Sequence, residues 1–144
     1  MDDPLIAAGA VAATMLLILI NWLIGGWRSA RVDSDSTARA RYAQDFPDDC
    51  ILDAAIDRNA RAALLALDTP RAMGLVVALG DRLVTRRLRE RDLRRADRDA
   101  TGLTLRLDDF VLPRVRMDLD ASTAQSWAKR LSCLMDEEAA RTAA

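Results

Sequence analysis

The densest group of side chains that could do chemistry in this sequence is a cluster of arginines between Asp81 and Asp99. Guanidinium groups bind phosphates and carboxylates through paired hydrogen bonds, so such a cluster could hold anionic lipid headgroups or an acidic partner. Two arginine-bearing runs further along the chain would reinforce it if they fold beside it. The seven residues that we assign to this candidate anionic-partner face are Arg86, Arg87, Arg94, Arg95, Arg106, Arg114 and Arg116.

The cluster has an ordinary alternative, which is a solvated sheet face covered by ion pairs. From Asp81 to Asp99, five acidic residues are interleaved with eight arginines, a mixture typical of exposed surfaces. No aromatic residue lies among the arginines to stack on bases, so we expect no nucleic-acid partner. The choice between a binding face and a solvated face stays open at this point.

The other residue types argue against an enzyme. The chain has no histidine, which removes the commonest general base, the usual metal ligand and the histidine-activated nucleophiles. The acidic pairs Asp48-Asp49 and Asp108-Asp109 lack the further oxygen ligands of a calcium loop and suit turns instead. We therefore expect no catalytic activity, no metal and no cofactor.

Length, charge and cysteine content set the class of protein. A chain of 144 residues has room for one small domain beside an anchor, and 21 basic residues nearly balance 22 acidic ones. All but one of the basic residues are arginine, the exception being Lys129, a bias typical of a GC-rich bacterial genome. Cys50 and Cys133 are too few for a zinc site or a disulfide scaffold, and we expect reduced thiols that behave as small buried hydrophobes.

The apolar run PLIAAGAVAATMLLILINWLIGGW, residues 4–27, carries no charged side chain. As a helix it would be about 36 Å long, enough to cross a hydrocarbon core of ~30 Å. No basic residue precedes it and no cleavage site follows it, so it does not fit a removable signal peptide. We expect residues 1–27 to be a transmembrane anchor with Trp22, Trp27, Arg28 and Arg31 at the membrane interface.

Small and polar residues in this run could pack against another membrane helix. Ala8-x-x-x-Ala12 and Gly9-x-x-x-Ala13 have the spacing that lets two helix backbones approach closely. Asn21 could donate an interhelical hydrogen bond or simply reach the headgroups. The alternative for the small residues is an alanine-rich composition without a partner, and both alternatives stay open.

Charge asymmetry around the run predicts its orientation. Acidic residues precede the run, whereas Arg28, Arg31, Arg39 and Arg41 follow it, so the positive-inside rule predicts a periplasmic N-terminus and a cytoplasmic C-terminal domain. The expected location is therefore the inner membrane of a bacterium, with the lipid bilayer and other membrane protein subunits as partners.

The rest of the chain divides into a juxtamembrane linker, residues 28–49, and a β-rich domain, residues 50–144. The linker is polar and lacks a sustained apolar period. Residues 48–60 favour a β-hairpin with a turn at 57–60, although one amphipathic helix over 48–58 is an alternative. Gly80-Asp81 predicts a type II′ turn between strands near 73–79 and 82–88. A charged, turn-rich stretch follows over 89–102, and then strands near 103–107 and 114–119 around the loop 108–113.

A C-terminal amphipathic helix closes the predicted fold. Ser122-x-x-Gln125 resembles a capping box, and an apolar stripe follows at three- and four-residue steps with Trp127 in its middle. About six strands in an antiparallel sheet or roll, capped by this helix, give an α+β fold class. Over roughly residues 50–138, the element order and the helix tryptophan resemble a pleckstrin-homology-type roll, a resemblance that implies the fold alone.

These patterns together predict a non-catalytic, single-pass membrane protein. We expect an accessory or scaffolding subunit of a larger membrane protein complex. The alternative is a membrane-surface binding module that uses the arginine-rich face for anionic lipid or an acidic partner.

Overall fold

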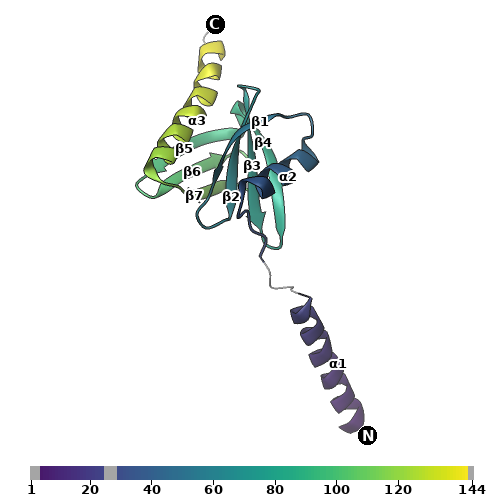
Figure 1. Ribbon diagram of the computed structural model, residues 1–144. Coiled ribbons are helices and arrows are strands. Elements are labelled where there is room, and N and C mark those ends of the chain that lie inside the picture. The colour runs from purple at the N-terminus through teal and green to yellow at the C-terminus, as the bar shows by residue number, and fades with distance from the viewer. Residues whose placement is uncertain (1–3, 25–28, 143–144) are drawn as a thin grey trace.

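The computed structural model describes residues 4–24 and 29–142, with side chains as far as Asp136. An N-terminal helix stands apart from a folded domain that contains two sheets and two helices (Figure 1). The elements in chain order are α1 (Pro4–Leu23), α2 (Asp35–Asp45), β1 (Ile51–Ile56), β2 (Ala62–Leu67), β3 (Ala72–Leu79), β4 (Arg82–Arg89), a short 3-10 helix (Glu90–Asp92), β5 (Leu93–Asp99), β6 (Gly102–Leu107), β7 (Arg114–Asp118) and α3 (Ala121–Thr142).

The strands form two antiparallel sheets, and each strand pairs with its neighbour in the chain. One sheet has the order β1-β2-β3-β4 and the other the order β5-β6-β7. Between the sheets lies the main core, in which alternate residues of the strands, such as Leu64, Leu75 and Leu105, are fully buried. The α+β fold class is therefore confirmed, with seven strands where the sequence predicted about six.

The predicted hairpins are present. β1 and β2 form an antiparallel hairpin whose pairing begins at Ile56 and Ala63 and ends at Ile51 and Leu67. Residues 48–60 therefore contain a strand and a turn, and not an amphipathic helix. Buried Asp57 organises this turn by accepting a hydrogen bond from the backbone N–H of Arg61, 3.2 Å away. In the β3–β4 turn only Gly80 has a positive φ, +63°, which agrees with a type II′ turn.

One strand contradicts the sequence analysis. The stretch 89–102, predicted as charged turns, contains β5, which pairs only with β6 along one edge of its sheet. Five of its seven residues are charged, so the alternation of apolar and polar residues that marks a half-buried strand is missing. Charged side chains on an edge strand discourage pairing with other chains, and this explains why a strand can carry them.

The segment predicted as a linker, residues 28–49, also needs correction. Residues 35–45 form α2, whose first turn is capped by the Ser34 side chain. Val32, Ala38 and Tyr42 are fully buried against the outer face of the four-stranded sheet. Most of this segment therefore belongs to the folded domain and makes a second, smaller core.

The closing helix α3 packs on β5 and β6 and completes the main core. Trp127 and Leu131 are buried in it, as the apolar stripe predicted. The helix is capped by Asp120, however, and not by Ser122. The Asp120 carboxylate accepts hydrogen bonds from the Thr123 N–H at 2.9 Å and from the Ser122 hydroxyl. The hydrogen bond from Ser122 is the main reason that the Asp120 pKa is lowered. The four-stranded sheet, the three-stranded sheet and the C-terminal helix follow one another in this order along the chain.

Candidate functional site

Helix α1 is long and apolar enough to span a membrane. Its 20 residues cover about 30 Å, and none of them is buried against the rest of the protein. A side chain at Gly9 would meet nothing within 4 Å. The helix therefore offers its whole surface to lipid or to a partner helix.

The predicted packing residues of α1 lie on two different sides. Ala8, Gly9, Ala12 and Ala13 share one strip, because residues four apart lie above one another on a helix. Asn21 lies two turns further along, and at ~100° per residue it falls on the far side from the middle of that strip. The strip and Asn21 therefore cannot serve one partner helix together.

The predicted interface residues are only partly described. Trp22 is exposed in the last turn of α1, and Arg31 is exposed at the start of the folded domain. Trp27 and Arg28 lie outside the described residues.

Two backbone hydrogen bonds fix where the chain joins the domain. The N–H of Ala30 donates to the Gly80 carbonyl at 2.9 Å, and the N–H of Val32 donates to the Ala60 carbonyl at 2.8 Å. The chain therefore enters between the β1–β2 turn and the β3–β4 turn, which we call the α1 end of the domain. Leu23 and Ala30 are seven residues apart, so this end lies at most about 25 Å from the end of α1.

The seven arginines of the predicted face do not form one surface. Arg86 and Arg87 are neighbours on β4 and point to opposite faces of its sheet, because side chains alternate along a strand. Arg87 reaches under α2 and pairs with Asp49 at 3.1 Å, and the side chain of Asp49 is only 7% exposed. Arg87 is thus a structural residue, and its assignment to a binding face is wrong.

Tyr42 completes the cluster under α2. Its hydroxyl donates to the second carboxylate oxygen of Asp49 at 3.0 Å, and burial together with this hydrogen bond raises the Tyr42 pKa. The ring lies so close to β3 that a Cβ on Gly74 would come within 2.8 Å of it. This cluster attaches α2 to the sheet and leaves no open site.

Two further arginines hold the loop between β6 and β7. Arg86 donates to Asp109 at 2.8 Å, which is the main reason that the Asp109 pKa is lowered. Arg94 pairs with Asp108. The Asp108-Asp109 pair therefore serves loop structure, in agreement with the sequence analysis.

The remaining four arginines share the outer face of the three-stranded sheet. Arg95, Arg106 and Arg114 are cross-strand partners and form one row, which we call the arginine row. Arg116 lies beside the row and contacts Thr101 and Asp99 at 2.9 and 3.7 Å. Four of the seven predicted arginines therefore share one face of this sheet.

Two members of the arginine row lack a counter-charge. Arg95 pairs with Asp97, but the side chains of Arg106 and Arg114 are exposed and form no hydrogen bond or ion pair within the described part of the chain. Like charges directly opposite each other on a sheet are destabilising. The carboxylates near this pair, Asp97 and Asp108, are paired with Arg95 and Arg94 instead.

Sequence reasoning did not single out Phe110, which lies in the loop that joins β6 to β7. Its side chain is fully exposed at the tip of the β6–β7 loop, and Val111 beside it is also exposed. The available signal was a run of three apolar residues, Phe110 to Leu112, inside a loop otherwise made of Asp and Pro.

The structure also has an open, mainly apolar pocket of about 550 Å³ between α3 and the strands β1–β3. Arg130 on its rim pairs with Asp53 at 3.0 Å and stacks over Trp127. Cys133 lines this pocket, and both cysteines are free but exposed, so their predicted burial is wrong. Among the residues that the structure describes, no group of three His, Cys, Asp or Glu side chains could hold a metal ion.

Comparisons of the chain with protein-family models, with curated proteins and with solved structures find no match. The fold and the geometry above are therefore the observations that bear on function.

Proposed function

We propose that the protein is a non-catalytic, single-pass membrane protein that acts as an accessory or scaffolding subunit of a larger membrane protein assembly. The observation that carries this proposal is α1, a fully exposed apolar helix on a short connection to a folded domain. The small-residue strip gives α1 a surface that suits close packing with another membrane helix. The lack of histidine in the chain supports a non-catalytic role.

For the location, we propose a bacterial inner membrane with the N-terminus in the periplasm and the folded domain in the cytoplasm. A reporter that is active only in the periplasm should be silent when fused after Ala144 and active when fused before Met1, because basic residues stay on the cytoplasmic side. The opposite pattern would overturn this orientation.

The subunit role is tested by co-purification from membranes in mild detergent. Gly9→Leu and Ala13→Leu place bulk on the small-residue strip and should release the co-purifying membrane chains. Ala7→Leu adds similar bulk on the other side of α1 and should leave them bound, which makes it the matched control. Retention of the same chains by all three variants would rule out packing through this strip.

A second function is favoured by the arginine row. The exposed, unpaired Arg106 and Arg114 support a membrane-surface binding module in which the outer face of the three-stranded sheet takes an anionic ligand, either lipid or an acidic partner. This role is compatible with the first, because it uses a different part of the protein.

A further inference from the structure

We propose that the pocket between α3 and the strands β1–β3 binds a medium-chain carboxylate, with its alkyl chain against the sheet and its carboxylate at Lys129. The pocket is separate from α1 and from the arginine row, so this inference goes beyond the proposed function. Its volume of about 550 Å³ lies in the range of small-molecule sites. An apolar site of this size with a few polar groups at its edge is the usual form of such a site.

The two walls of the pocket differ in chemistry. The wall made by the sheet and the β2–β3 turn is mainly apolar and includes Leu52, Ala66, Leu67, Pro70 and Met73. The side of α3 that faces the pocket is mainly polar and includes Ser126, Lys129, Arg130 and Cys133. From Ser126 to Cys133 the helix rises by about 10 Å. A ligand that touches both walls therefore needs an apolar side and a polar group.

A β-bulge in β1 shapes the apolar wall. Ala54 and Ile56 pack on the α2 side of the sheet, and regular alternation along the strand would place Leu52 on that side too. The pairing register shifts between Ile51 and Asp53, and Leu52 lies between them as the extra residue of a bulge. Leu52 instead lines the pocket, where it is 67% exposed. A large apolar side chain that the backbone turns into an open pocket suits contact with an apolar ligand.

Backbone groups of β1 beside the pocket already have side-chain partners. Arg39 donates to the Ile51 carbonyl at 2.9 Å. The Ala54 N–H donates to the Asp53 carboxylate, also at 2.9 Å. A peptide strand added here would have to displace these side chains or bury its own N–H and C=O groups unpaired, which is costly. An alkyl chain has no such groups, so the pocket favours an alkyl ligand over an extended peptide.

Lys129 supplies the charge that selects an anionic head. Its neighbour Arg130 is held by Asp53 at 3.0 Å and lies over the Trp127 ring. The exposed Lys129 side chain forms no hydrogen bond or ion pair among the residues whose side chains the structure describes. Asp53 is the one carboxylate among the described lining residues, and it is already paired. The charge left for a ligand is therefore positive, which matches a carboxylate.

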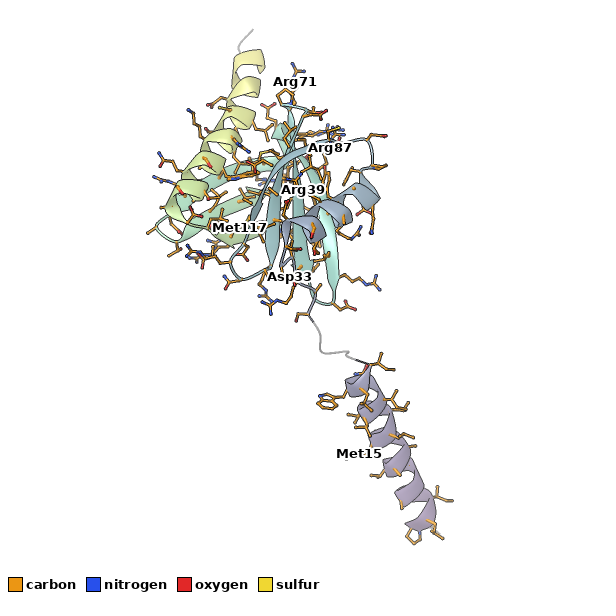
Figure 2. The ribbon with its side chains drawn as sticks, in the orientation of Figure 1. Met15, Asp33, Arg39, Arg71, Arg87 and Met117 are labelled. Carbon is orange, nitrogen blue, oxygen red and sulfur yellow. The ribbon has the colours of Figure 1, made fainter. Side chains whose placement is uncertain are left out.

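The pocket lies at the end of the domain away from α1. Its sheet wall is made by the start of β1, the end of β2 and the start of β3. These lie opposite to the two turns that accept hydrogen bonds from Ala30 and Val32. Figure 2 places Arg71, in the β2–β3 turn, at this far end. With α1 in a bilayer, a ligand would reach the pocket from water, and this favours a single-chain carboxylate over a phospholipid.

The test follows the reactivity of Cys133, which lines the pocket. Full-length protein with Cys50→Ser is placed in lipid nanodiscs, and the rate at which its single thiol reacts with a water-soluble maleimide is measured. Hexanoate, octanoate and decanoate are supplied by dialysis, so that the free concentration of each is known despite uptake by the lipid. The matched control is Cys133→Ser, whose only thiol, Cys50, is exposed outside the pocket.

We expect each carboxylate to slow the reaction of Cys133 and to leave that of Cys50 unchanged. Each added methylene should tighten binding by about fourfold while the chain still finds room on the apolar wall. Octanoate should bind better than octylammonium, which has the same chain and the opposite charge. Lys129→Gln should weaken the binding of octanoate by about two- to fivefold and reduce this preference.

Two tryptophan variants of α3 test the location. Ser126→Trp puts a large side chain into the pocket and should abolish the protection of Cys133 by octanoate, measured against the variant's own rate without ligand. Gln125→Trp adds the same bulk at a neighbouring exposed position that does not line the pocket, and it should leave the protection unchanged.

Four results would overturn the proposal. The first is that decanoate gives Cys133 no protection, and the second is that Ser126→Trp and Gln125→Trp are protected equally. Equal slowing of Cys133 and Cys50 would assign the effect to the lipid and not to the pocket. Equal binding of octylammonium and octanoate would show that the site does not select a carboxylate.

Discussion

Arg87 and Arg114 carry the same charge in very different surroundings. Arg87 pairs with a nearly buried carboxylate under α2, whereas Arg114 is exposed and lies opposite another arginine. Removing one partner of a buried ion pair leaves the other charge desolvated, whereas removing an exposed charge changes little. The two positions therefore distinguish a structural arginine from one that is free to bind.

Arg87→Gln should lower the free energy of unfolding of the domain by about 2–3 kcal/mol, because the nearly buried Asp49 carboxylate loses the cation that it pairs with. Arg114→Gln should change it by no more than about 0.5 kcal/mol. Urea unfolding of the full-length protein in detergent, followed by near-ultraviolet circular dichroism, measures both. Equal effects of the two substitutions would contradict the division of the predicted face.

At the scale of elements, the sequence predicted the strands and the helix in which the spacing of apolar residues matches the side that packs in the main core. β3, β4, β6, β7 and α3 contribute alternate residues or one helical stripe to the main core, and all were expected within a few residues. β5 and α2 were missed for different reasons. Five of the seven residues of β5 are charged and lie on a sheet edge, and α2 buries only two residues, Ala38 and Tyr42, so neither has a readable period.

The candidate site was predictable to a similar extent. The sequence identified all four arginines of the outer face of the three-stranded sheet. It did not indicate that the Arg87 side chain would lie under α2, because α2 itself was not predicted. Phe110 needed the structure, because exposure depends on how the loop is anchored and not on residue type.

Helix α2 gives a prediction about where the domain begins. A fragment of residues 29–144 should be monomeric and folded, whereas residues 46–144 should aggregate, because the face that packs on Val32 and Tyr42 would be exposed. Burying side chains of this size contributes about 1.5–3 kcal/mol each, a large share of the stability of a small domain. Size-exclusion chromatography and thermal melting compare the two fragments. A monomeric 46–144 fragment with an unchanged melting temperature would show that α2 is dispensable.

At the scale of the whole molecule, the titratable groups predict an uneven dependence of stability on pH. Among the residues that the structure describes, four carboxyl groups have a pKa below the usual value, chiefly through hydrogen bonds from Thr85, Thr101, Arg86 and Ser122: Asp45, Asp99, Asp109 and Asp120. A lowered pKa in the folded state stabilises the protein above the unfolded value of about 3.9, and this stability is lost as the pH falls through the folded value.

The melting temperature of the domain should therefore be nearly constant between about pH 6 and 8, where no histidine titrates, and should fall steeply below about pH 4. Calorimetry of the 29–144 fragment over this range measures it. Asp120→Asn should reduce the acid-dependent loss, because it removes one of the four groups. A steep change near neutral pH would contradict this assignment of the titrating groups.

The way the chain joins the domain has a mechanical consequence. A pull from the membrane reaches Ala30 and Val32 first, and their two backbone hydrogen bonds to the turns break one after the other. The load then peels α2 from its sheet before β1 carries any of it, because β1 begins at Ile51, at the end of the sheet opposite to these turns. We expect single-molecule pulling to show a small extension step that precedes separation of the two sheets. Helix α2 would thus detach first, and the connection to the membrane would lengthen under tension while the main core stays closed.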